Sequence, residues 1–144
     1  MLDLERISKN LQDIYSEVDE IDDLFLCKNI EDILEDPLIL KALKYSVITI
    51  NEAIANTLQH ILAKHFSISI SGYAECLEKA CQYQIISKDL FQRLSPFVRF
   101  RNMLVHRYWI VNDEIFLRNL KEGLEDFRKF QLEIKEWLKK HNYL

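Results

Sequence analysis

Apolar residues recur along the chain of 144 residues at the alternating three- and four-residue spacing of amphipathic helices. The first stripe predicts a helix from about residue 2 to the mid-twenties. It consists of Leu4, Ile7, Leu11, Ile14, Val18, Ile21 and Phe25. The last stripe predicts a helix that runs almost to the end of the sequence. It begins after Asn112, because an Asn followed by Asp113 and Glu114 is typical of a helix N-terminus.

The middle of the chain predicts further helices. A short helical piece is expected at EDILED, and Asp36 followed by Pro37 predicts the N-cap and first turn of a second long helix. That helix has apolar residues on most of its sides. We therefore expect it to be buried centrally in a bundle or against a partner chain.

The segment FSISISGY at residues 66–73 alternates apolar and polar residues as a strand does. A lone short strand has nothing to pair with, so an extended linker is the better prediction, with Ser71 as the N-cap of a third helix. A fourth helix is expected from near Ser87. Pro96 lies well inside it and should kink or break it.

Composition favours an all-α fold, because the chain has two Gly and two Pro and is rich in Leu, Ile, Glu and Lys. We expect one domain over residues 1–144, an up-and-down bundle of about four to five helices. The N-terminus MLDLERISKN lacks the pattern of a secretory signal, and no apolar run reaches the ~20 residues of a membrane span. Three cysteines without CxxC spacing favour a reducing compartment, so a cytoplasmic protein is expected.

The net charge of −4 argues against nucleic-acid binding, but the distribution of charge argues for it. The 23 residues between Asp89 and Asp113 contain four arginines and no carboxylate. The rest of the chain has 15 basic and 23 acidic residues, a net charge of −8. Positive charge is thus concentrated in one window, although chance clustering on a solvated face would give the same pattern.

The basic window includes RNMLVHRYW at residues 101–109. On a straight helix, at ~100° per residue, Arg101 and Tyr108 fall on nearly the same side. Asn102 and His106 are four residues apart, so the amide can hydrogen-bond the imidazole across one turn and set which ring nitrogen is free. Arg101 and His106 converge on one ligand only if the helix ends or distorts between Leu104 and Arg107, or if two copies meet.

These residue types suit phosphate chemistry. An arginine binds phosphate and stabilises a pentacoordinate transition state, and a histidine moves protons at neutral pH. Together they suffice for metal-independent RNA cleavage, in which the 2′-hydroxyl attacks the adjacent phosphate. The alternative is that His106 caps a helix end and the arginines are solvated.

In the form R-N-x3-H-x-Y the motif resembles the signature of the HEPN superfamily, specifically the HepT-like toxins encoded beside minimal nucleotidyltransferase antitoxins. The resemblance extends to INEAIANTLQHIL, SGYAECLEKACQYQII and VNDEIFLRNLKEGLEDFRKF. It implies a helical bundle that dimerises, with the motifs of both subunits lining one cleft. It also implies a ribonuclease acting on tRNA or mRNA without metal or other cofactor.

The resemblance gives each motif residue a role. Arg101 and His106 would be catalytic, and Asn102 would orient His106. Tyr108 matches the tyrosine to which the partner nucleotidyltransferase transfers AMP, and the added phosphates would block the cleft and repel RNA. A larger hetero-oligomer with that antitoxin is also expected. Arg99 and Arg107 are further candidates for lining the cleft.

On the second long helix Glu52, Asn56 and either Gln59 or His60 form a polar stripe. The family commonly has an acidic residue and an Asn-His pair near there. Glu52 could line the cleft or pair with an arginine, although a solvated or interface position is the favoured interpretation. His65 and His141 are expected to have no partners, and no metal site is expected because no HxxxH or His/Cys cluster exists.

Two other interpretations remain. The chain could be a non-catalytic helical module that binds a nucleotidyltransferase and presents a substrate to it, as the acidic charge and the apolar second helix suggest. It could also be a silent dimer in which the motif serves packing.

Overall fold

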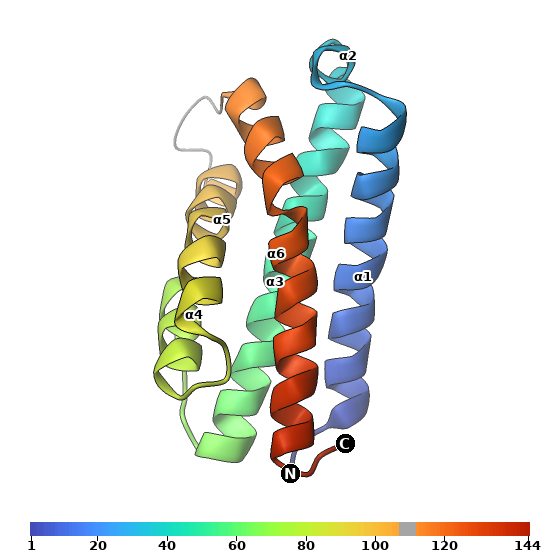
Figure 1. Cartoon of the computed structure of the whole chain (residues 1–144). Coiled ribbons are helices and arrows are strands. Elements are labelled where there is room, and N and C mark those ends of the chain that lie inside the picture. Colours follow the sequence, from blue (N-terminus) through green and yellow to red (C-terminus); the bar gives the residue numbers. More distant parts are fainter. Residues whose placement is uncertain (107–111) are drawn as a thin grey trace.

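A computed structural model of the chain describes residues 1–106 and 112–144, and for His106 it describes the backbone alone. The described residues form six α-helices (Figure 1). They are α1 (Leu4–Cys27), α2 (Ile30–Leu34), α3 (Pro37–Phe66), α4 (Tyr73–Gln82), α5 (Lys88–His106) and α6 (Asp113–Lys140). The predicted all-α bundle is confirmed, with four long helices running up and down beside one another, the five-residue α2, and the ten-residue α4 against α3 and α5.

The sequence signals at most helix starts are confirmed. The Asp36 carboxylate accepts hydrogen bonds from the backbone N–H groups of Leu38 and Ile39 at 3.2 Å, and Pro37 follows in the first turn of α3. Asn112 caps α6 by accepting from the Ile115 N–H at 3.1 Å. Each side-chain oxygen satisfies backbone donors that have no partner within the helix.

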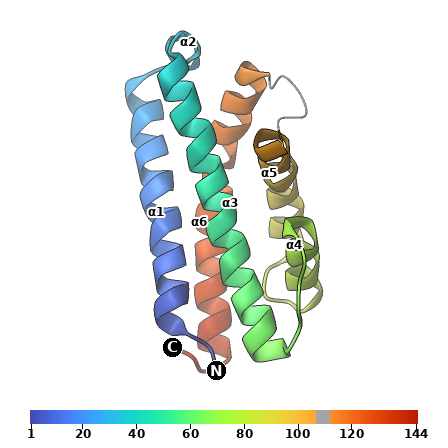
Figure 2. The same cartoon turned by 180° about the vertical axis from the view of Figure 1, so that it is seen from behind.

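Helix α3 occupies the centre of the fold, as its all-round apolar pattern predicts. It packs against α1 on one side and against α4 and α5 on another (Figure 2). Its fully buried residues include Val47, Ile50, Leu58 and Ile61. Near its start, however, Leu38 and Tyr45 are exposed, so the apolar pattern extends beyond the surface that the other helices cover.

Residues 67–72 form a linker without helix or strand, as predicted, although Ser67 is left-handed and not extended. The predicted cap at Ser71 is wrong. The N-cap position of α4 is Gly72, which has a φ of +92° and no side chain to accept a hydrogen bond. Ser71 instead donates its hydroxyl to the Glu75 carboxylate at 3.2 Å. A residue without a Cβ adopts this backbone conformation without strain, which explains why the helix begins one residue later than the capping rule predicts.

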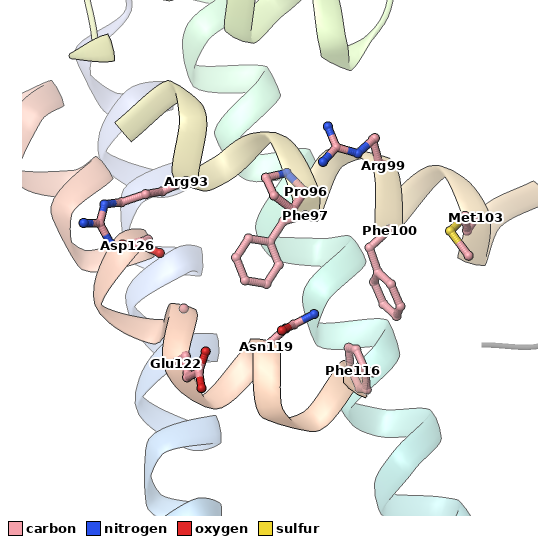
Figure 3. A pocket seen from close by; sticks show the side chains of 11 residues that line it. Arg93, Pro96, Phe97, Arg99, Phe100, Met103, Phe116, Asn119, Glu122 and Asp126 are labelled. Carbon is pink, nitrogen blue, oxygen red and sulfur yellow. Dashed lines mark ion pairs between the residues drawn. The ribbon is translucent and has the colours of Figure 1, made fainter. Parts of the chain in front are cut away.

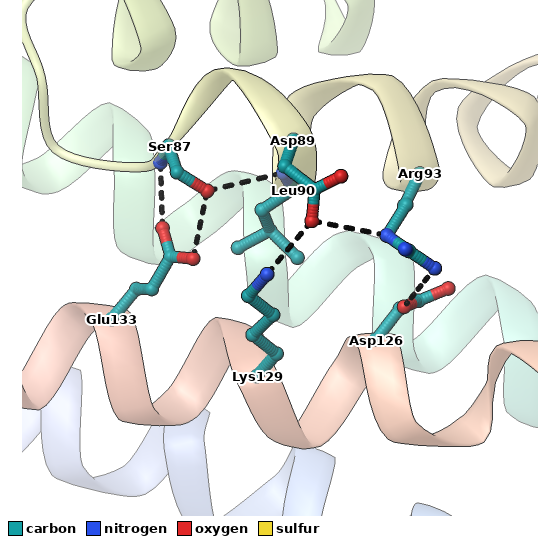
Figure 4. Close-up of polar contacts among 7 residues, drawn as sticks. All are labelled: Ser87, Asp89, Leu90, Arg93, Asp126, Lys129 and Glu133. Carbon is teal, nitrogen blue, oxygen red and sulfur yellow. Dashed lines mark hydrogen bonds and ion pairs between the residues drawn. The ribbon is translucent and has the colours of Figure 1, made fainter.

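Helix α5 continues through Pro96 and has no break there. On either side of the proline, Leu94, Phe97 and Val98 are buried, so packing on both flanks holds the helix together. At its start, the hydroxyl and backbone N–H of Ser87 bond to Glu133 of α6 at 2.8 and 2.6 Å (Figure 4). The Ser87 hydroxyl oxygen also accepts from the Leu90 N–H, so the predicted start near Ser87 is confirmed.

Helices α5 and α6 approach closely where the ring of Phe97 lies over Gly123. A Cβ atom added to Gly123 would stand 2.3 Å from Cζ of Phe97. The same ring packs on Phe127, with centroids 4.8 Å apart. Gly123 therefore lets α5 reach α6, and Phe97 fixes how α5 is turned about its own axis.

We predict that Gly123→Ala destabilises the protein in urea unfolding. Overpacking costs about 1–3 kcal/mol, and the better helix propensity of alanine offsets roughly 1 kcal/mol of this. In a Phe97→Leu background the same substitution should cost less, since the shorter side chain leaves room for the methyl group. If Gly123→Ala lowers the free energy of unfolding equally with and without the Phe97→Leu substitution, the absence of a side chain at Gly123 does not serve to make room for the Phe97 ring.

The buried His60 ties the N-terminus to α3. Its Nε2 accepts a hydrogen bond of 2.8 Å from the backbone N–H of Asp3, and the residue is 6% exposed. Burial, with a smaller contribution from Arg6, lowers the pKa of His60 below its ordinary value of 6.5. Protonation would both place a charge in this site and remove the acceptor.

A pH dependence of stability follows. Below about pH 6.5, His60 takes up a proton in the unfolded chain but stays neutral in the folded chain, because its pKa is lower in the folded state. The contribution of neutral His60 to the free energy of unfolding is therefore complete above pH 6.5 and is lost as the pH falls toward the lowered pKa. Thermal unfolding between pH 7.5 and 5 should show a shallower decline for His60→Gln than for the unsubstituted protein. Identical declines would rule out this role.

The expectation that His65 and His141 have no partners is wrong. Nδ1 of His65 lies 2.6 Å from the Tyr143 hydroxyl, and Nδ1 of His141 donates to the Trp137 carbonyl at 2.9 Å. The Trp137 ring stacks on His141 at 4.2 Å and meets His65 edge-on at 4.9 Å. The hydrogen bond between His65 and Tyr143 joins residues 78 positions apart, which helical periodicity does not reveal, whereas Trp137 and His141 are one helical turn apart.

Candidate functional site

Arg101 lies near the end of α5 with its side chain only 14% exposed. One terminal nitrogen donates to the Asn102 amide oxygen at 3.2 Å, and the other donates to the Tyr73 hydroxyl at 3.2 Å. The guanidinium carbon also sits 4.0 Å from the centre of the Tyr73 ring, the geometry of a cation–π contact. The guanidinium of Arg101, the first residue of the motif, is thus held by contacts on several sides.

The counter-charge of Arg101 is Glu52 on α3. The Glu52 carboxylate lies 3.6 Å from a terminal nitrogen of Arg101, and its side chain is 48% exposed. Sequence reasoning favoured a solvated or interface position for Glu52 over a position lining the cleft or paired with an arginine, and the structure places Glu52 beside Arg101 while leaving it half exposed. Glu52, Asn56 and the half-buried Gln59 follow one side of α3, and the buried His60 is not part of that stripe.

The hydrogen bond expected between Asn102 and His106 falls outside what is described, since it needs the His106 side chain. Helix α5 does continue to His106, so the one-turn spacing between the two residues is kept. The Asn102 amide oxygen faces Arg101, which leaves its N–H₂ group as the donor for an imidazole. Arg107 and Tyr108 lie outside the described residues, as does any helix end after His106.

Arg99 is on the opposite side of α5 from Arg101, because two residues along a helix turn by ~200°. It lines an open groove of about 540 Å³ between α5 and α6 (Figure 3). Phe97, Phe100 and Phe116 form the apolar part of that groove, and Asp126 of α6 faces Arg93 of α5 across it. Within one chain, Arg99 and Arg101 therefore do not share a surface.

Carboxylates from α5 itself and from α6 accompany Arg93, the first arginine of the basic window. Arg93 donates to Asp89 at 3.1 Å and approaches Asp126 of α6 at 3.7 Å, while Lys129 also donates to Asp89 at 2.8 Å (Figure 4). The bonds from Lys129 and Arg93 lower the pKa of Asp89, and burial raises the pKa of Asp126. The arginines that are close together in the basic window of the sequence are consequently separated in the structure, where they face different neighbours.

Tyr73 is the site residue that sequence reasoning missed. It is 28 positions from Arg101, on another helix, and no spacing rule connects the two. Its partial burial against the core offers no distinguishing signal either, since aromatic residues on a helix usually serve packing.

Neither a metal centre nor a membrane span is found in the described parts of the chain. Across residues 1–106 and 112–144, no group of three or more His, Cys, Asp or Glu side chains is arranged to hold a metal ion. No helix within the same residues combines the length and apolar character needed to cross a bilayer.

Chemically, Arg101 is suited to binding an anion at its two terminal nitrogens. Its Nε–H is buried and has no hydrogen-bond partner among the described atoms, so a ligand reaches the guanidinium only from its outer end. Each terminal nitrogen has two hydrogens, and the bonds to Asn102 and Tyr73 occupy one on each. A phosphate arriving there would compete with Glu52.

The fold has solved counterparts. An AMPylated HEPN toxin from Shewanella oneidensis, solved with its MNT antitoxin, superimposes with a TM-score of 0.83 at 21% identity, over 91% of this chain and 97% of that one. The toxin–antitoxin pair MntA-HpeT, solved as a mutant, gives 0.81 at 20% identity, over 92% and 98%. A cytosolic protein of unknown function from Bacillus subtilis, YutE, gives 0.83 at 15% identity, over 97% and 93%.

A search of curated protein sequences finds no match. The family model described as "Ribonuclease HepT-like" matches residues 14–134, which takes in most of α1 and α6 and everything between them. The chain therefore belongs to the HepT-like ribonuclease family.

Proposed function

We propose that this protein is a metal-independent endoribonuclease toxin of a HEPN/minimal nucleotidyltransferase pair. The observation that carries the proposal is Arg101, a largely buried and oriented guanidinium on the helix that also bears His106, in a chain of the HepT-like ribonuclease family. The substrate would be tRNA or mRNA, cleaved without a cofactor.

The chemistry requires a ribose 2′-hydroxyl. His106, with its imidazole oriented by Asn102, takes the proton from that hydroxyl as the oxygen attacks the adjacent phosphorus. Arg101 stabilises the added negative charge on the phosphorane. The bond to the 5′-oxygen then breaks, that oxygen takes up a proton, and the products are a 2′,3′-cyclic phosphate and a 5′-hydroxyl end.

One histidine cannot serve as base and acid in the same instant, which supports a homodimer whose two motifs line one cleft. Two copies would bring two histidines and two arginines to one phosphodiester. The uncovered apolar residues on α3, Leu38 and Tyr45, favour association with another chain.

The partner would be a minimal nucleotidyltransferase antitoxin, which inhibits the toxin by transferring AMP to Tyr108. Support comes from the Shewanella toxin, which is tri-AMPylated and was solved with an MNT antitoxin. Phosphates added beside Arg101 would occupy its free donors and repel RNA. The toxin and antitoxin could also assemble into a larger hetero-oligomer.

A non-catalytic module that binds the nucleotidyltransferase is the second candidate. The ion pair that already occupies Arg101 favours it, because a charge compensated by Glu52 attracts RNA less strongly. Behaviour of the chain in the absence of its partner separates the two functions.

Expression of the chain alone should arrest growth, and Arg101→Ala or His106→Ala should relieve the arrest, since each removes a group that acts in the transition state. Arg118→Ala is the matched control, because Arg118 is exposed and its ion pair among the described residues is with Glu114 on its own helix. Purified protein should also cut RNA in excess EDTA. Full toxicity of His106→Ala, together with intact RNA, would contradict the proposal.

Co-expression with the neighbouring nucleotidyltransferase should add one or more AMP units to the protein, detected by intact-mass spectrometry. Tyr108→Phe should abolish the addition, and Tyr45→Phe, at an exposed tyrosine of α3, should not. An unmodified protein in the presence of active partner and ATP would exclude this form of inhibition.

A further inference from the structure

Helix α4 places one aromatic side chain against the motif. Tyr73 is the first residue of α4, and the extended linker at residues 67–72 brings it there from the end of α3. The Tyr73 side chain is partly buried and packs against the hydrophobic core, and it borders a small cavity together with Asn51 and Ile54 of α3 and Val98 of α5. The ring is therefore held independently of Arg101.

Two contacts from this one side chain fix two properties of the guanidinium. The ring face, 4.0 Å from the guanidinium carbon, attracts the cation and limits its tilt. The hydroxyl oxygen, 3.2 Å from a terminal nitrogen, accepts a hydrogen bond and limits rotation about the long axis of the side chain. Glu52 is too exposed and too distant, at 3.6 Å, to set that orientation by itself.

We infer that Tyr73 is a positioning residue, which orients the Arg101 guanidinium so that the free hydrogens of its terminal nitrogens point to the substrate phosphate. This inference rests on the proposed function. Tyr73 itself touches no reacting atom. Its contribution should appear mainly in kcat, because correctly oriented N–H groups of Arg101 stabilise the phosphorane more than they stabilise the bound substrate.

The kinetic test compares Tyr73→Phe, which keeps the ring and loses the hydroxyl, with Tyr73→Leu, which loses both. On a labelled single-stranded RNA oligonucleotide that the unsubstituted protein cuts, Tyr73→Phe should lower kcat about threefold. Tyr73→Leu should lower it about tenfold or more. KM should change by no more than about twofold in either variant, since the rest of the RNA contacts remain.

Tyr83→Leu is the matched control, because Tyr83 packs on Phe66 at the other end of α4, away from Arg101. It removes a tyrosine at the C-cap of α4, directly after the helix ends, and should leave kcat unchanged. A kcat for Tyr73→Leu equal to that of the unsubstituted protein would overturn the inference. An equal loss in Tyr83→Leu and Tyr73→Leu would do so too, because it would assign the effect to α4 as a whole.

A second measurement does not depend on cleavage. The buried Nε–H of Arg101, beside an aromatic ring, should give a slowly exchanging and ring-shifted signal in ¹⁵N NMR spectra, assigned by its loss in Arg101→Ala. The signal should persist in Tyr73→Phe and move or disappear in Tyr73→Leu. An unchanged signal in Tyr73→Leu would refute positioning by Tyr73. The expected NMR pattern without RNA cleavage would instead refute the proposed function alone.

Discussion

The contact between Phe97 and Gly123 determines how α5 is presented to the rest of the protein. Helix α5 packs on α3, α4 and α6, and few rotations about its axis bury its apolar residues against all of them. The ring of Phe97, in contact with Gly123 and Phe127 of α6, selects one of these rotations. The directions of the side chains further along α5 follow from this rotation. Arg101 is directed toward α3 and α4, and Arg99 toward the groove beside α6.

The same constraint explains why charge that is continuous in sequence is divided in space. Arg93 is matched by Asp89 and Asp126, and Arg101 by Glu52. Neutralisation of this kind weakens long-range attraction of RNA and leaves short-range geometry as the main source of recognition. An acidic protein can then act on a polyanion if a few donors are correctly placed when the substrate arrives.

Local patterns in the sequence were sufficient for most of the fold. Stripes of apolar residues and caps such as Asp36 and Asn112 depend on neighbours within one or two turns, and these predictions were confirmed. Predictions failed where contacts between distant parts of the chain decide the outcome, as with the bond between His65 and Tyr143. The same holds for the candidate site. The motif could be recognised from the sequence, because its residues are neighbours along the chain. The contact between Arg101 and Tyr73 joins two helices and has no sequence signature.

The backbone at Gly72 has a consequence for how such a protein can lose its activity. Open space surrounds the position where a Cβ would be, so no neighbour opposes a larger residue, but a φ of +92° does. A substitution there would shift the start of α4 and with it the ring beneath Arg101, while every residue of R-N-x3-H-x-Y stayed in place. Homologues that carry the full motif could thus be inactive because of a single change in a linker, and an intact motif alone is an insufficient criterion for calling them ribonucleases.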